Sequence, residues 1–307
     1  MSRELRAALA EHRPGLLRHG YRMLGSIADA EDVVQSAMER AWSGREGYRG
    51  DASIKNWLYR IATHACLNAL ASKARRALPQ LESSPAEVGV PLYEDPQERW
   101  ITPAADAQLF ADPGAAAESR ETVALAFIAL LQRVPPKQRA ALLLKDVLGW
   151  RAEEIASTME LSLGSVNSAL HRARESVAHS APFEEPAPAT LGAFVRAWES
   201  RDLDALVALL RRDVELAMPP YPMWFKGVEA VAQFFRAPRF STFWATVARA
   251  IPTRANGLPA FAFYVSEAGG PPKPHAMLVA RFEGGQTAAM TVFLGAGSFL
   301  GFGLQAP

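Results

Sequence analysis

Residues 165–175, SVNSALHRARE, combine hydroxyl, amide, imidazole and guanidinium groups at helical spacing. Side chains of these types hydrogen-bond to base edges and phosphates in the major groove of DNA. The opposite side carries Val166, Ala169, Leu170 and Ala173, which indicates a face packed against a core. The pattern predicts an amphipathic helix with one DNA-reading face. An ordinary packed helix with a solvated face is the alternative.

The preceding segment, WRAEEIASTMELS, completes a larger motif. Ile155, Ala156 and Met159 form a second short apolar pattern, and the small Ala156 suits a close helix crossing. Ser162 is a good N-cap for the helix that follows. Helix, tight connection and capped helix together predict a helix-turn-helix.

A second candidate surface for nucleic acid lies between residues 52 and 81, where the sequence contains no acidic residue. Its cations are Lys55, Arg60, Lys73, Arg75 and Arg76, and the aromatic residues in and beside it are Tyr48, Trp57 and Tyr59. Rings that stack on bases, next to cations that hold phosphates, are typical of proteins that bind single strands. The alternative is an amphipathic helix in which Trp57 is part of the core.

Composition limits the class of protein. The chain has 307 residues, of which 49% are hydrophobic, and this length suffices for two or three cores. A net charge of +1 gives no global attraction to nucleic acid, so any attraction is local. The one cysteine, Cys66, excludes an internal disulfide, fits a reducing cytoplasm and is expected to be a small buried residue. Charges interrupt the first residues, so neither a signal peptide nor a membrane span is expected.

Proline and charge mark the boundaries of the elements that must position these residues. Residues 78–118 are rich in proline and acidic side chains, which predicts an extended linker. Helical periodicity returns over residues 119–180, where Pro135 and Pro136 begin a helix and Gly149 ends it. A second proline stretch, residues 181–190, precedes the last part of the chain.

Several ordered motifs now carry a family resemblance. DAEDVVQSAMERAW, YRGDASIKNWLYRIATHACLNAL, VPPKQRAALLL and the final helix-turn-helix together resemble the extracytoplasmic-function group of the sigma-70 family, over roughly residues 5 to 180. The resemblance implies two all-α domains: region 2 at residues 1–77 and the helix-turn-helix region 4 at residues 119–180. It also implies that the chain binds core RNA polymerase and directs transcription initiation.

The resemblance assigns the helix over residues 29–42 to the clamp of the polymerase. The implied contacts are Asp29, Asp32, Gln35 and Glu39. An acidic outer face beside an apolar inner stripe agrees with a basic partner. Ser36 stands where the family more often has glutamate, which puts one clamp contact in doubt.

The resemblance also assigns promoter contacts. The implied contacts with the minus-ten element are Arg49, Lys55, Asn56, Trp57, Tyr59, Arg60, His64, Lys73, Arg75 and Arg76, with a pocket for a flipped base at residues 47–52. The implied contacts with the minus-thirty-five element are Arg151, Ser165, Asn167, Ser168, His171, Arg172 and Arg174. His64 replaces a frequent asparagine, and Glu160 replaces the usual glycine of the turn. A left-handed conformation at Glu160 would cost about 1 kcal/mol.

For the acidic linker, the resemblance implies a path toward the active centre of the polymerase. An extended polyanion suits a channel built for RNA. A disordered spacer is the alternative.

Residues 191–307 show a long amphipathic helix, a second helical turn, a strand and a shorter helix, followed by alternating strands with turns at ANGLP, EAGGPPK and EGG. Helices before a meander predict an α+β cone. The region resembles the SnoaL-like polyketide cyclases, which share a fold with nuclear transport factor two and ketosteroid isomerase. The candidates to line its pocket are Trp198, Met218, Tyr221, Trp224, Phe234, Tyr264, His275 and Phe293, and plain core packing is the alternative.

Catalysis is not expected in this domain. His275 and Glu215 are possible acids or bases, but MPPYPMWF has no carboxylate where the isomerases keep their base. No metal or cofactor is expected.

The sequence thus predicts a sigma factor regulated by its own C-terminal domain. Its expected partners are the clamp and flap regions of core polymerase, promoter DNA and a small apolar ligand, and its expected location is the cytoplasm at the nucleoid. The alternatives are a SnoaL-like isomerase or hydrolase tethered to a degenerate sigma segment, and a helix-turn-helix regulator outside the sigma family.

Overall fold

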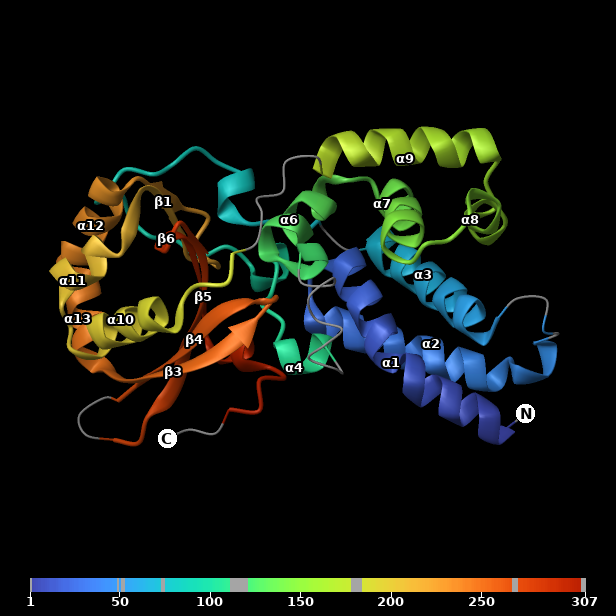
Figure 1. Ribbon diagram of the computed structural model, residues 1–307, viewed down its shortest axis with the longest axis horizontal. Helices are drawn as coiled ribbons and strands as arrows, with labels where there is room; N and C mark the ends of the chain where they lie inside the picture. Colours follow the sequence, from blue (N-terminus) through green and yellow to red (C-terminus); the bar gives the residue numbers. More distant parts are fainter. Residues whose placement is uncertain are drawn as a thin grey trace. The chain divides into compact units, whose positions relative to one another are not determined.

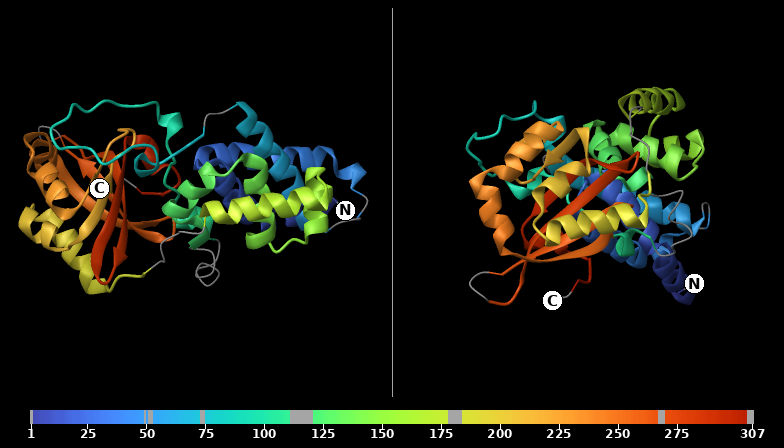
Figure 2. Two further views of the ribbon diagram at one scale, coloured as in Figure 1. Left: turned by 90° about the horizontal axis from the view of Figure 1, so that it is seen from above. Right: turned by 60° about the vertical axis from the view of Figure 1, so that its left-hand side comes forward.

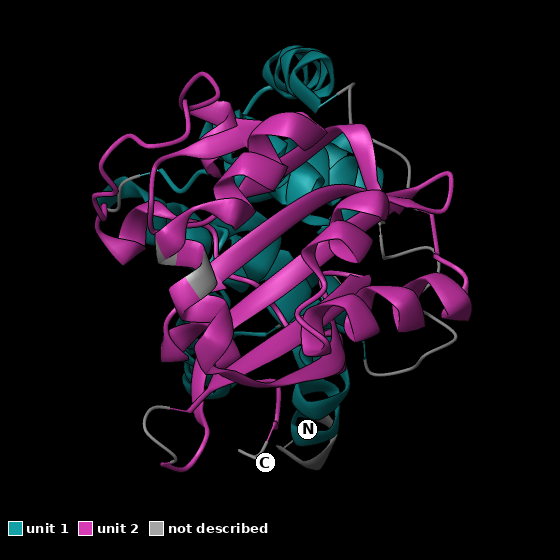
Figure 3. Cartoon of the chain, turned by 90° about the vertical axis from the view of Figure 1, so that its left-hand side faces the viewer, with its two compact units in different colours: residues 1–77, 108–181 teal, residues 78–107, 182–307 magenta. Residues whose placement is uncertain are grey.

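The computed structural model describes residues 2–48, 50, 53–72, 75–110, 121–177, 184–266 and 270–304. The chain forms two compact units, each made from two separate stretches of sequence (Figure 3). The first unit comprises residues 1–77 and 108–181, and the second comprises residues 78–107 and 182–307.

The first unit is helical (Figure 1). Its elements are α1 (Ser2–Leu24), α2 (Ile27–Ser43), η1 (Arg45–Gly47), α3 (Ile54–Ser72), η4 (Glu121–Val123), α6 (Leu125–Arg133), α7 (Pro136–Leu142), the π-helical turn η5 (Leu143–Val147), α8 (Ala152–Met159) and α9 (Leu163–Val177). A short helix, α4 (Asp106–Leu109), lies at the boundary between the units.

Local sequence explains where the helices of the first unit begin and end. Ser26 caps α2 by accepting a hydrogen bond from the Asp29 N–H, at 3.2 Å. Gly149, at φ +73°, follows η5, because only glycine adopts the left-handed region without strain. The α9 residues expected to face the core, Val166 and Ala173 among them, are fully buried. Cys66 is also fully buried, and burial raises its thiol pKa to about 12.

The second unit is a mixed sheet with helices on one side (Figures 1 and 2). The sheet order is β2-β1-β6-β5-β4-β3, in which β1 and β6 are parallel and the other neighbours are antiparallel. The strands are β1 (Leu210–Ala217), β2 (Trp224–Lys226), β3 (Val247–Ala255), β4 (Leu258–Val265), β5 (Lys273–Glu283) and β6 (Gln286–Leu294). The helices are η2 (Pro79–Leu81), η3 (Gln97–Arg99), α10 (Pro188–Glu199), α11 (Leu203–Ala208), α12 (Val228–Arg236), α13 (Pro238–Thr246) and η6 (Ala296–Phe299).

Two hairpin turns have the residues that tight turns require. Asn256 and Gly257 join β3 to β4 with φ of +57° and +75°, and Gly284 and Gly285 join β5 to β6 with φ of +59° and +74°. Consecutive positive φ angles match the right-handed twist of paired strands. The α+β architecture agrees with the sequence prediction, including its order of helix, helix, strand and helix.

The proline-rich stretch differs from the free linker expected at residues 78–118. Residues 78–107 belong to the second unit, and Trp100, Ile101 and Ala104 are almost fully buried. Proline prevents regular secondary structure but not burial, and a buried tryptophan or isoleucine contributes about 1.5–3 kcal/mol of transfer free energy. Residues 111–120 lie outside the described part of the chain.

No helix in the described ranges is both long enough and apolar enough to span a membrane.

Candidate nucleic-acid interface and ligand cavity

Three of the four expected polymerase contacts lie exposed on α2. These are Asp32, Gln35 and Glu39, and the Gln35 amide donates to Glu39 at 3.1 Å. Asp29 differs because its half-buried carboxylate accepts a hydrogen bond from Arg76, at 2.9 Å. The acidic face therefore starts at Asp32, and Asp29 joins α2 to the chain after α3.

The expected minus-ten residues divide by burial. Lys55, Arg60 and Arg75 are exposed, while Asn56, Trp57, His64 and Arg76 are half-buried. Arg49 and Lys73 fall outside the described residues.

Tyr59 is a core residue rather than an exposed stacking platform. It is 4% exposed and packs edge-on against His19, with ring centroids 5.5 Å apart. Burial raises the pKa of its phenol. The aromatic pair beside the cations is instead Tyr48 with Trp57, which are both half-buried and have their ring centroids 5.0 Å apart.

An open hollow of about 420 Å³ lies where the sequence suggests a pocket for a flipped base. It is lined by Arg40, Gly44, Gly47, Trp57, Arg60, Ile61 and His64. A ring, two guanidinium groups and an imidazole around one hollow could hold a base and its phosphates. The cation Arg40 comes from α2, outside the basic stretch that the sequence analysis singled out.

All the expected minus-thirty-five residues are exposed. Their side chains extend from α9 and from the residue before α8. Two of them already have partners, since Arg174 forms a two-pronged ion pair with Asp146 at 2.6 and 2.8 Å, and His171 lies 3.7 Å from Glu175. Asn167, Ser168 and Arg172 complete the polar face, which is in reach of a DNA groove.

The turn of the helix-turn-helix is strained at one residue. Glu160 ends α8 at φ +54° and ψ +45°, which is the left-handed conformation. Ser162 then accepts a hydrogen bond from the Ser165 N–H, at 3.1 Å, and caps α9. The turn thus keeps the geometry of a glycine without having one.

The minus-ten helix and the helix-turn-helix touch each other within the first unit. The His64 ring nitrogen Nε2 lies 2.9 Å from the carbonyl oxygen of Thr158 in α8, and the Asn56 amide lies 3.5 Å from Glu154. Two residues expected to read DNA are therefore engaged by the domain expected to read a different promoter element.

A buried polar network fastens the same two parts together. Arg139 of α7 is 2% exposed and donates to the Met23 carbonyl of α1 and to both oxygens of Gln132. Gln132 in turn donates to the Arg22 carbonyl at 3.1 Å. Burial lowers the pKa of both Arg22 and Arg139 to about 10, so both remain charged at neutral pH.

The second unit encloses an apolar cavity of about 250 Å³ between its helices and its sheet. Five of the eight expected residues line it, namely Trp198, Met218, Tyr221, Phe234 and His275. The others are Leu92, Leu216, Phe235, Ala237, Phe240, Phe243, Phe263, Ala276, Leu278, Met290, Val292 and Leu294. Burial lowers the pKa of His275, whose ring stacks on Phe243 with centroids 4.7 Å apart.

The remaining three expected residues do not line this cavity. Tyr264 and Phe293 follow and precede lining residues along their strands, so they point to the opposite face of the sheet, where Tyr264 packs on Phe299. Trp224 donates its indole N–H to the Ser83 carbonyl at 3.0 Å.

A short proline-rich segment forms part of the cavity wall. Residues 83–95, which we name the strap, run beside the loop between β1 and β2. Besides the bond of the Trp224 indole to the Ser83 carbonyl, further hydrogen bonds hold the strap: Ala86 N–H to the Trp224 carbonyl at 2.8 Å, Asp95 N–H to the Pro220 carbonyl at 3.0 Å, and the Tyr221 hydroxyl to Glu94 at 3.1 Å. Leu92 of the strap lines the cavity.

Residues 108–181 separate the two stretches of the second unit, and one guanidinium group pairs with residues just before and just after them. Arg254 of β3 pairs with Asp106 at 3.2 Å and with both oxygens of Glu185 at 2.7 and 3.0 Å. We name these three residues the clasp. Asp106 also accepts the Gly257 N–H at 2.7 Å.

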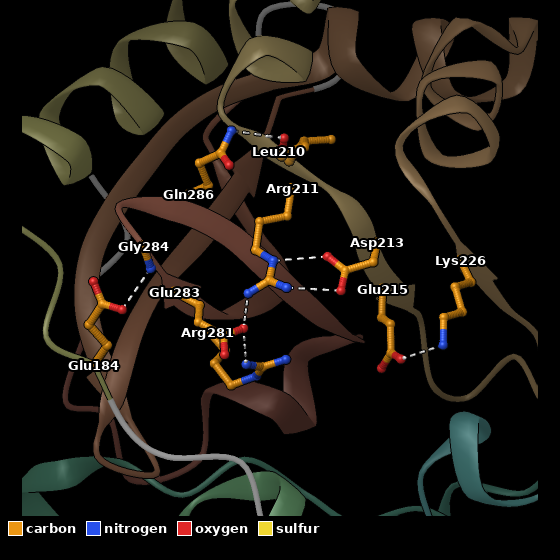
Figure 4. Close-up of polar contacts among 10 residues, drawn as sticks. All are labelled: Glu184, Leu210, Arg211, Asp213, Glu215, Lys226, Arg281, Glu283, Gly284 and Gln286. Atoms are coloured by element: carbon orange, nitrogen blue, oxygen red, sulfur yellow. Dashed lines mark hydrogen bonds and ion pairs between the residues drawn. The ribbon is translucent and has the colours of Figure 1, made fainter.

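The neighbouring Glu184 accepts the Gly284 N–H at 2.7 Å, at the β5–β6 turn (Figure 4). The candidate base Glu215 lies outside the cavity, where it pairs with Lys226 at 3.7 Å (Figure 4). Among the described residues, no group of three histidine, cysteine or acidic side chains could hold a metal ion.

The sequence analysis missed the residues that join distant segments: Arg139, Gln132, Leu92 and Arg254. Each is an ordinary residue on its own element, and its role depends on a partner roughly 110 or more positions away in most cases. The one available signal was Arg139, which directly precedes the apolar run AALLL and so indicates a buried cation.

Comparison with known families matches three parts of the chain. Residues 9–76 match Sigma-70 region 2, residues 124–177 match Sigma-70, region 4, and residues 191–290 match the SnoaL-like domain.

Individual relatives extend the likeness to nearly the whole chain. The ECF RNA polymerase sigma factor SigG of Mycobacterium tuberculosis is 38% identical over 306 residues, which cover 95% of this chain and 82% of the relative. SigE of Mycolicibacterium smegmatis, also an ECF RNA polymerase sigma factor, is 32% identical over 54% of this chain and 56% of its own length. The crystal structure of the extracytoplasmic function sigma factor SigJ of Mycobacterium tuberculosis has the same fold, with a TM-score of 0.63 at 23% identity, over 97% of this chain and 98% of that one.

Proposed function

This chain belongs to the extracytoplasmic-function group of RNA polymerase sigma factors, and from that premise we propose how its two units share the work. The first unit binds core RNA polymerase and reads the promoter, and the second unit regulates it. The observation that carries this assignment is the likeness to SigG along the whole chain, which includes the second unit.

Core polymerase docks on the acidic face of α2. Asp32, Gln35 and Glu39 lie exposed on one side of a helix whose other side is buried, which supports a basic partner. The clamp and flap regions of the polymerase are the proposed partners of the first unit.

Promoter recognition requires the first unit to open. The minus-ten and minus-thirty-five elements lie about 25 base pairs apart, which is about 85 Å at ~3.4 Å per base pair. The contacts between α3 and α8 cannot persist over that distance. We therefore assign this structure to a closed state, in which the network of Arg139, Gln132 and Arg22 holds the two DNA-reading parts together.

The second unit regulates opening by holding the chain on both sides of region 4. The strap and residues 104–106 precede region 4, Glu184 and Glu185 follow it, and all of them bind the second unit. A small apolar ligand in the cavity is the proposed signal. The path of residues 78–118 toward the polymerase active centre applies to the open state.

The second unit acts by binding and not by catalysis. The relatives of the whole chain are sigma factors, which are not enzymes. The cavity lining contains no carboxylate, and Glu215 lies outside it, which supports a binding role. We place the protein in the cytoplasm, at the nucleoid.

Transcription in vitro tests the proposed function. Full-length protein with core polymerase should produce transcripts from a promoter library on which core polymerase alone is silent. The triple variant Asn167→Ala, His171→Ala, Arg172→Ala should lose most of these transcripts but keep its binding to core polymerase. A complete absence of factor-dependent transcripts over a broad library would contradict the proposal.

A further inference from the structure

The cavity of the second unit excludes charged ligands by its chemistry. Among its described lining residues, His275 is the one group that titrates near neutral pH, and burial keeps it uncharged there. No lysine, arginine, aspartate or glutamate lines the cavity to compensate an ionic ligand. An uncharged, mainly apolar molecule is the class of ligand that this wall accepts.

The volume of the cavity also limits the size of the ligand. An apolar cavity of about 150 Å³ accommodates benzene. This cavity of about 250 Å³ therefore accommodates a molecule of about two fused rings.

The strap connects the cavity to the sigma part of the chain. Leu92 lines the cavity. Two residues later, Glu94 accepts a hydrogen bond from the hydroxyl of Tyr221, which also lines the cavity. A ligand that contacts Leu92 binds more tightly when the strap is docked, and by reciprocity the bound ligand favours the docked strap.

We propose that the cavity binds one uncharged, mainly apolar molecule, and that this molecule holds the strap on the second unit. The proposal rests on the regulatory role assigned above to the second unit. Its tests measure binding and amide exchange and involve no transcription, so either proposal can fail without the other.

Three probes of one size test the ligand class on the full-length protein by titration calorimetry. They are 2-naphthol, which has an acceptor oxygen, naphthalene, which has none, and 2-naphthoate, which is charged at neutral pH. We expect both neutral probes to bind, and 2-naphthoate to bind at least about tenfold more weakly than 2-naphthol. Equal affinity for 2-naphthol and 2-naphthoate, or no binding of either neutral probe, would overturn the ligand class.

Hydrogen exchange tests the coupling to the strap. At a 2-naphthol concentration ten times its Kd, the amides of Ala86 and Asp95 should exchange up to about tenfold more slowly. Leu92→Ala should abolish this slowing, whereas Tyr93→Ala, which changes an exposed neighbour outside the wall, should retain it. Exchange rates that do not respond to 2-naphthol, or that respond equally in Leu92→Ala, would overturn the coupling.

Discussion

One residue of the helix-turn-helix, Glu160, has a strained backbone conformation. Glu160 holds a left-handed conformation that costs a residue with a Cβ atom about 1 kcal/mol, and no ion pair of its side chain is seen among the described residues. Glu160 keeps this conformation because the turn then places Ser162 at the start of α9, where it caps the helix.

Replacing Glu160 with glycine should therefore stabilise the protein. We expect Glu160→Gly to raise the free energy of unfolding by about 0.5–1 kcal/mol, measured by urea denaturation. The control, Glu175→Gly, changes an exposed residue inside α9 and should lower it by about 1 kcal/mol. A loss of stability in Glu160→Gly would show that the side chain contributes more than the turn costs.

His19 makes the stability of the first unit depend on pH. The ring is fully buried, its Nε2 lies 2.9 Å from the Thr63 hydroxyl, and burial, with a smaller effect of Arg22, lowers its pKa from 6.5 to about 3. The unfolded chain therefore takes up a proton between pH 6.5 and 3 that the folded chain does not. The free energy of unfolding falls with falling pH throughout this window and is unaffected by His19 above it.

Comparison of His19→Gln with the wild type isolates this effect. Between pH 6.5 and 5.0 the wild type should lose about 1.6 kcal/mol more than the variant, because the slope approaches 1.36 kcal/mol per pH unit only below pH 6.5. The exposed His171→Gln should follow the wild type. Parallel curves for wild type and His19→Gln would contradict the assignment.

At the scale of elements, the outer face of α2 is the surface at which binding can be changed most independently of the fold. Its acidic residues Asp32 and Glu39 are exposed, so changing one of them should alter binding and leave the fold intact. Asp32→Lys should weaken association with core polymerase by at least about tenfold, measured by competition for core enzyme, because it introduces like charge at the proposed basic clamp.

The charge-matched control for this prediction is Glu11→Lys, on the exposed side of α1. It should leave the affinity within about twofold of the wild type. Equal weakening in both variants would point to net charge rather than to a docking site on α2.

Elements were predictable from the sequence where periodicity and caps agree, as in α9 with its buried stripe and its cap at Ser162. The sequence did not predict the face of the sheet to which each strand residue points. Alternation shows that two faces exist but not which one faces a cavity, and the register of β4 on β5 shifts between Phe263 and Tyr264. This is why Tyr264 was expected in the cavity that Phe263 lines.

The strap shows a second limit of sequence reasoning. Prolines correctly excluded helices and strands over most of residues 78–107, but the absence of regular structure was taken as the absence of packing. The docking of Ala86 and Leu92 depends on partners more than a hundred residues later, and local patterns carry no information about them.

At the scale of the whole molecule, the second unit is discontinuous, and the clasp closes it. Arg254→Met removes the ion pairs with Asp106 and Glu185, of which Asp106 is the most buried partner. We expect the protease Glu-C to cleave after Glu184 about three- to tenfold faster in this variant, measured by mass spectrometry, because the segment opens more often.

Arg236→Met serves as the control. It removes a solvent-exposed ion pair with Asp204, of a kind that contributes about 0–1 kcal/mol, and should leave cleavage after Glu184 unchanged. Unchanged cleavage in Arg254→Met would show that the clasp does not hold this segment.

The clasp also imposes an order in time. Arg254 follows Asp106 by 148 residues and Glu185 by 69. At about 5–20 residues per second, a ribosome adds Arg254 about 7–30 seconds after Asp106. Both DNA-reading helices are therefore complete before Arg254 is made, and each nascent chain passes through a brief period of its synthesis without the clasp.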